Sequence, residues 1–165
     1  MLRAVAHDDV VMAQPDGASP GILALVWQAG ALLSLCVMFH SLSLVTLGRA
    51  LRRRHLTART TFSGNLLVVV GVTTTIVSVH LVEIACWAAV YVWQGCVPDA
   101  STAFYFSAVT YTTVGYGDVV LSEGFRALAA TEALTGILLS GLSTGFLFAV
   151  LSQIFNGQVA SSAES

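Results

Sequence analysis

The chain has 165 residues, of which 56% are hydrophobic and 10% are charged, and its formal net charge is −2. Soluble domains usually carry about 25% charged residues, so a water-soluble core is disfavoured. The weak net charge gives no indication of a nucleic-acid partner. Membrane spans joined by short connections explain this composition better.

A first transmembrane helix is predicted over residues 21–48, after an N-terminal tail of residues 1–20. The stretch 21–47 contains no Asp, Glu, Lys or Arg, and it is longer than the roughly 20 residues that cross a bilayer. A cleaved signal peptide is disfavoured because the preceding tail is more acidic than basic and the apolar run exceeds the usual core of about 7–15 residues. We therefore interpret the stretch as a retained span.

An arginine-rich loop is predicted over residues 49–65. The positive-inside rule places such a loop in the cytoplasm, which predicts an outside N-terminus and a cytoplasmic C-terminus in a multi-pass protein of the cell membrane. Setting this orientation is the simpler role of the cluster. A second role is to bind anionic lipid. The arginines concerned are Arg49, Arg52, Arg53 and Arg54, with Arg59 further along the loop.

Two more transmembrane helices are predicted, an outer helix over residues 66–94 and an inner helix over residues 125–155. Residues 156–165 have the composition of a disordered cytoplasmic tail. The three cysteines have no metal-ligand spacing. Cys96, which lies between the two helices, is expected to be a free thiol, with an intersubunit disulfide as the alternative.

The insert between these helices combines a short helix with a glycine-bearing run. A polar break ends at Asp99 and Ser101, either of which can cap a helix over residues 101–111. That helix is too short to cross a bilayer. Residues 112–118 then read Thr-Thr-Val-Gly-Tyr-Gly-Asp. A re-entrant loop is predicted, because non-helical backbone at membrane depth must be buried in protein or line a water-filled path.

The run at residues 110–118 resembles the selectivity-filter signature of potassium channels. The resemblance covers residues 66–155 and leaves the first span outside the two-span pore module. It implies an all-α membrane fold, assembled as a homotetramer around a central pore, with K⁺ as the permeant ion and no cofactor. The implied K⁺ ligands are carbonyls of Thr113, Val114, Gly115 and Tyr116 and the Thr113 hydroxyl, with Gly117 completing the filter and Thr112 and Asp118 supporting it.

We call residues 113–117 the strip. If its backbone carbonyls line an ion path, its conformation can be predicted further. Gly115 and Gly117 can adopt positive φ without a side-chain clash, which lets successive carbonyls face one side. Val114 and Tyr116 are expected to turn away from the ions and pack against the short helix over residues 101–111, which the resemblance identifies as the pore helix. Asp118 is expected behind the filter mouth, within reach of a hydrogen bond to the pore-helix region. Members of the family often have tryptophans in this helix, whereas this chain has aromatic residues at 104–106.

The inner helix carries candidates for a hinge and a gate. Gly136 is either a bend that opens the inner mouth or a site of close helix packing. Helical spacing puts Ile137, Gly141, Thr144 and Phe148 on one face. If that face lines the cavity, four copies of Phe148 would form a hydrophobic gate. The alternative is that Phe148 faces lipid or a neighbouring helix.

Three ionisable residues, His80, Glu83 and Glu132, fall at membrane depth, where such groups are costly. One hypothesis is that Glu83 and Glu132 approach one another and that proton binding tunes opening. An unchanged pH dependence of activity in Glu83→Gln and Glu132→Gln variants would exclude it. The simpler interpretation is that each group is protonated or hydrogen-bonded locally. His40, in the first span, is expected to be a satisfied buried polar residue.

The sequence contains no catalytic constellation, so an enzyme is not expected. It also contains no voltage sensor of the charged-helix kind. Two alternatives to a potassium channel stay open. One is a weakly selective cation channel, which the intact Thr-Val-Gly-Tyr-Gly run disfavours. The other is a non-conducting regulatory subunit that docks on a larger channel through its first span.

Overall fold

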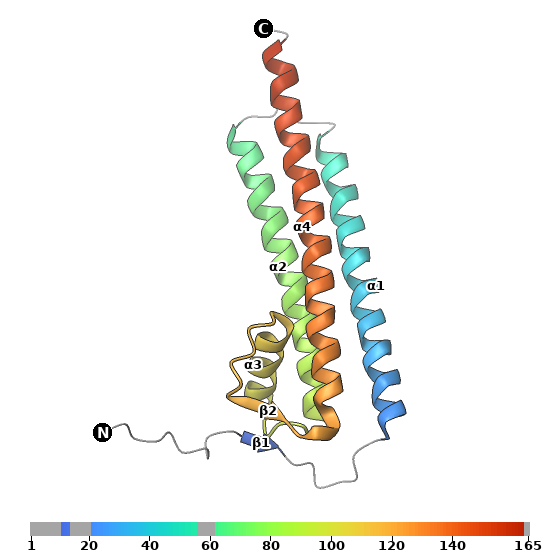
Figure 1. Ribbon diagram of the computed structural model, residues 1–165. Helices are drawn as coiled ribbons and strands as arrows, with labels where there is room; N and C mark the ends of the chain where they lie inside the picture. Colours follow the sequence, from blue (N-terminus) through green and yellow to red (C-terminus); the bar gives the residue numbers. More distant parts are fainter. Residues whose placement is uncertain (1–10, 14–20, 56–61, 164–165) are drawn as a thin grey trace, which may run out of the picture. The chain divides into compact units, whose positions relative to one another are not determined.

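The computed structural model describes residues 11–13, 21–55 and 62–163. Its helices are α1 (Ile22–His55), α2 (Phe62–Trp93), α3 (Ala100–Tyr111) and α4 (Arg126–Ala163), with a 3-10 turn at Glu123–Phe125 (Figure 1). Three of these helices are long and apolar enough to cross a membrane. The predicted all-α membrane fold is confirmed.

The long helices form because their sequences are apolar and free of proline, whose ring would break the backbone hydrogen-bond ladder. Hydroxyl groups inside them are satisfied within the same helix. Ser34, for example, bonds to the Gly30 carbonyl (2.8 Å), and Thr135 bonds to the Thr131 carbonyl (2.8 Å). Such local bonds let polar side chains remain in a helix that lipid surrounds.

The described residues divide into two compact units, and the three long helices contribute to both. One unit consists of Met1–Cys36 and Val82–Ile137, and the other of Val37–Leu81 and Leu138–Ser165. The first unit contains α3 and the run at residues 112–118. Its largest fully buried side chains include Trp87, Tyr91, Phe125 and Leu128.

The second unit has an aliphatic core in which all three long helices take part. Val72 and Ile76 of α2 meet Val150 and Ile154 of α4. Partly buried residues of α1 pack against this cluster, namely Leu44, Leu47 and Leu51. The first span is therefore packed on the helices of its own chain.

Several boundaries differ from the sequence-based predictions. α1 continues to His55, so Arg49, Arg52, Arg53 and Arg54 belong to a helix and not to a loop; Arg59 lies outside the described residues. Arginine is a good helix former, which lets the span continue through the cluster. α4 likewise continues to Ala163, where a disordered tail was predicted from residue 156. The cost of Gly157, about 1 kcal/mol, does not end that helix.

A short parallel pair of strands was not predicted. β1 (Val11–Ala13) pairs with β2 (Val119–Leu121), with Val11 opposite Val119. The two segments are far apart in the sequence, and each is only three residues long. Strands of this length carry no periodic signal, so the sequence offers no means of finding the pair. It joins the N-terminal tail to the chain that follows residue 118.

Candidate selectivity filter

A side-chain cap starts α3. The Asp99 carboxylate accepts hydrogen bonds from the backbone N–H groups of Ser101 (2.9 Å) and Thr102 (3.0 Å), and from the Thr102 hydroxyl (2.7 Å). The bond from the Thr102 hydroxyl, followed by the backbone bonds, lowers the pKa of the Asp99 carboxyl. Of the two candidate caps, Asp99 is the one that caps the helix.

The other end of α3 lies deep beside α2. The hydroxyl of Tyr111, the last residue of α3, donates a hydrogen bond of 2.6 Å to Glu83. Glu83 precedes the end of α2 at Trp93 by ten residues, or about 15 Å at 1.5 Å per residue. In Figure 1 the chain that follows α3 turns back and runs beside α3 toward β2. A short helix beside α2, followed by a chain that turns back, is the arrangement expected of a re-entrant loop; its depth in a membrane stays a prediction.

The backbone after α3 alternates in handedness. Thr113, Gly115 and Gly117 have positive φ values of 61°, 51° and 77°. The prediction for the two glycines is confirmed, whereas Thr113 was not foreseen, because a β-branched residue rarely adopts this conformation. The N–H of Gly115 donates to the Val109 carbonyl (3.1 Å) and that of Thr113 to the Thr110 carbonyl (2.9 Å). These bonds hold the strained segment against α3.

Thr112 supports the start of this segment. Its backbone N–H and its hydroxyl both donate to the Ala108 carbonyl, at 3.1 Å and 2.7 Å. Three of the carbonyl groups that α3 would otherwise leave unsatisfied, those of Ala108, Val109 and Thr110, thus bond to the segment that follows it. The end of α3 and the start of the strip therefore form one hydrogen-bonded corner.

The side chains of the strip are open to the surroundings. Val114 is 51% exposed and Tyr116 is 72% exposed. The expected packing of these side chains on the pore helix is therefore not completed within one chain. Residues 112–118 as a whole are exposed, which leaves one side of the strip free for other atoms.

Asp118 is held from α3, as predicted. The Tyr105 hydroxyl donates a hydrogen bond of 2.7 Å to the Asp118 carboxylate. This bond lowers the pKa of Asp118 and raises the pKa of the Tyr105 phenol. The hydrogen bond from Tyr105 ties the end of the strip to α3.

Glu132 is fully buried and hydrogen-bonded locally. Its carboxylate accepts a bond of 2.6 Å from the Tyr91 hydroxyl of α2 and another from the Ser107 hydroxyl of α3. Tyr91 also packs edge-on against Phe106, with ring centroids 5.1 Å apart. One carboxylate on α4 thus connects α4 to α2 and α3. Glu83 and Glu132 are each hydrogen-bonded to a tyrosine. This agrees with the simpler interpretation made from the sequence, in which each group is satisfied locally.

Gly136 packs against the end of α3. A Cβ atom built on Gly136 would lie 1.9 Å from the carbonyl oxygen of Tyr111 and 2.8 Å from its carbonyl carbon. No side chain fits between α4 and this backbone, so close packing by itself requires glycine here. Gly141 and Gly145 have no such neighbour within 4 Å. The structure gives a reason for Gly136 that does not depend on a hinge.

The candidate gate residues of α4 lie on its surface in this single chain. Phe148 is 71% exposed, and Thr144 and Gly141 are also exposed. Ile137 shares their helical spacing and is likewise exposed. Within residues 21–55 and 62–163, no side chain covers this face. Both a pore-lining role and a lipid-facing role require such an open face. The assignment of Thr144 and Phe148 to a gate stays a prediction.

His40 and His80 lie in the unit that does not contain the strip, and both bond to Ser143 of α4. The Ser143 hydroxyl is 3.0 Å from Nε2 of His40 and 3.0 Å from Nε2 of His80. The two rings are 5.0 Å apart, and His40 is fully buried. The expectation that His40 is a satisfied buried residue is confirmed. Ser143, which joins α1 and α2 to α4, was missed because an isolated serine in an apolar span carries no signal.

Cys96 is a buried free thiol. Burial raises its pKa to about 11. A protonated and enclosed thiol is a poor partner for an intersubunit disulfide, which agrees with the expected free cysteine.

Comparison with known proteins adds one match. Residues 79–153 match the family model Ion_trans_2, described as an ion channel. The matched range includes the end of α2, all of α3, the strip and most of α4, and it leaves out α1. This match indicates an ion channel, and the three long apolar helices indicate a multi-pass membrane protein. No curated protein and no solved structure matches the chain.

Proposed function

We propose that four copies of this chain form a central pore that conducts K⁺ passively and selectively across the cell membrane. The observation that carries the proposal is the Thr-Val-Gly-Tyr-Gly strip at residues 113–117. Its backbone alternates in handedness directly after the capped helix α3. The strip lies within the range that matches an ion channel.

The chemistry of the strip suits a weakly hydrated cation. Carbonyl oxygens that face one side can replace the water shell of K⁺. The C-terminal end of α3 presents the negative end of the helix dipole next to the strip, which favours a cation that has lost water. One chain supplies one wall, and the exposed Val114 and Tyr116 are then available to neighbouring copies. A tetramer completes both the ring of ligands and the packing.

The orientation in our proposal follows the arginine distribution. The arginine-rich end of α1 lies in the cytoplasm, the N-terminus and the strip lie toward the outside, and the C-terminus is cytoplasmic. α1 contributes to the core of its own chain through Leu44, Leu47 and Leu51. This packing supports a built-in helix of each subunit more than a free docking element of a regulatory protein.

The test is ion flux in liposomes that contain the purified protein. K⁺ flux well above Na⁺ flux, blocked by barium, is expected. Gly115→Ala should abolish the flux while the tetramer survives, because its φ of 51° disfavours a side chain and no neighbour lies within 4 Å. Flux without preference for K⁺ would refute selectivity. A stable tetramer without flux would favour the regulatory subunit.

A further inference from the structure

A groove opens beside the arginine-bearing end of α1, in the unit that does not contain the strip. We call it the α4-side groove, and its volume is about 360 Å³. Gly48 lies beside the Phe146 ring: a Cβ there would make ordinary van der Waals contact with it at 3.5 Å, so only a longer side chain would fill the groove. The residues that line it are Leu44, Val45, Gly48, Arg49 and Arg52 of α1 and Phe146 of α4.

The position of the groove determines what surrounds it. The candidate span of α1 is Leu23–Arg53, so the apolar part of the groove belongs to the span and its two arginines lie at the end of that span. Apolar surface at this position faces acyl chains, whereas the end of the span reaches the headgroups. A lipid can occupy both environments at once because it is itself apolar at one end and polar at the other.

The two arginines are suited to a phosphate group. Arg49 and Arg52 are three residues apart and therefore project from the same face of α1. Both are exposed, and both line the groove. Guanidinium groups bind phosphate through paired hydrogen bonds. Arg53 is also exposed but does not line the groove, which makes it a matched control.

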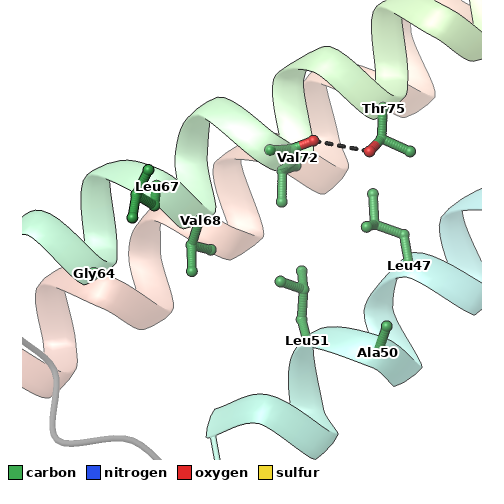
Figure 2. A pocket seen from close by; sticks show the side chains of 9 residues that line it. Leu47, Ala50, Leu51, Gly64, Leu67, Val68, Val72 and Thr75 are labelled. Atoms are coloured by element: carbon green, nitrogen blue, oxygen red, sulfur yellow. Dashed lines mark hydrogen bonds between the residues drawn. The ribbon is translucent and has the colours of Figure 1, made fainter.

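A second groove in the same unit lacks this charge. Figure 2 shows it between α1 and α2, where Leu47 and Leu51 face Val68 and Val72. Its volume is about 400 Å³, and among the described residues none that lines it is charged. A groove of this kind can take an acyl chain but has nothing that selects a headgroup.

We propose that the α4-side groove binds one anionic phospholipid, with an acyl chain along Gly48 and Phe146 and the phosphate against Arg49 and Arg52. The combination of an apolar hollow within the span and two arginines at its end carries this assignment. It does not depend on ion conduction, so it can be tested on the purified protein whatever the outcome of the flux measurements.

The experiment is native mass spectrometry of the purified full chain, after incubation with equal amounts of phosphatidylglycerol and phosphatidylcholine that carry the same acyl chains. Retention of phosphatidylglycerol is expected in the wild type. Arg52→Gln should lower its affinity relative to phosphatidylcholine about fivefold, from the usual contribution of about 1 kcal/mol per basic residue near a membrane. Arg53→Gln should leave it unchanged. Excess inorganic phosphate should not displace the lipid.

Filling the grooves gives the second arm. Gly48→Leu should remove the retained phosphatidylglycerol, whereas Gly71→Leu, in the groove between α1 and α2, should not; a Cβ at Gly71 has no neighbour within 4 Å. Equal losses in Arg52→Gln and Arg53→Gln would show diffuse attraction and overturn the proposal. Retention in Gly48→Leu would do the same. If Gly48→Leu changes the number of assembled chains but keeps the lipid, the groove binds a second copy of the chain, and the lipid proposal is wrong.

Discussion

Replacing Gly136 by alanine is expected to displace the end of α3 and damage the strip that follows it. The new Cβ would lie 1.9 Å from the Tyr111 carbonyl oxygen. Real contacts of this kind are essentially never shorter than 3.0 Å, so the two backbones must separate by about 1.1 Å. Tyr111 is also bonded to Glu83 (2.6 Å), and its movement would strain that bond.

Two opposing terms decide the size of the effect. Alanine favours a helix over glycine by up to about 1 kcal/mol. Overpacking a well-filled site costs about 1–3 kcal/mol, and more where backbone has to move. Because the clash at Gly136 is with backbone, we expect a net loss of about 1–2 kcal/mol in the free energy of unfolding. We also expect a clear loss of K⁺ flux, because Thr112 and Thr113 follow Tyr111 directly and would be displaced with it.

The assay is thermal unfolding in detergent, together with K⁺ flux in liposomes. Gly141→Ala and Gly145→Ala are matched controls on the same helix, where a Cβ has no neighbour within 4 Å. Both should keep or slightly raise the stability. Wild-type stability and flux in Gly136→Ala would refute the reasoning, and so would equal losses in all three variants. A hinge, by contrast, predicts intact stability with altered opening only at Gly136.

Two further predictions concern tyrosine hydroxyls, each removed by a change to phenylalanine. Tyr105→Phe should let the pKa of Asp118 rise toward its ordinary value of 3.8. The charged carboxylate, which is present above this pKa and lost as the pH falls through it, would then be lost at a higher pH, and acid inhibition of flux should begin earlier. Tyr91→Phe removes a bond to buried Glu132 and should lower the free energy of unfolding by about 1–3 kcal/mol.

Each tyrosine prediction has its own control. Asp118→Asn should show the low-pH behaviour at every pH, and an unshifted acid limb in Tyr105→Phe would contradict the role of this bond. For Tyr91→Phe the comparison is Tyr105→Phe, the same chemical change at an exposed site. If both variants unfold at the same temperature, the buried hydrogen bond between Tyr91 and Glu132 contributes no more to stability than the exposed one, and the prediction is wrong.

Features that depend on local sequence could be predicted. The lengths of the apolar stretches define three spans, because crossing a bilayer needs a fixed number of helical residues. A cap at Asp99 or Ser101, and positive φ at Gly115 and Gly117, follow from the conformational preferences of single residues, and the structure selects Asp99. Where the prediction erred locally, at the ends of α1 and α4, helix propensity continued past the apolar stretch.

Features that join distant parts of the chain needed the tertiary structure. Glu132 of α4 meets Tyr91 of α2 and Ser107 of α3 only because these helices pack together. Gly136 in the sequence is equally a hinge or a packing site. The Tyr111 carbonyl, 1.9 Å from where a side chain would begin, gives it a packing role. Contact between helices is a property of three-dimensional distance, on which the identity of one residue carries no information.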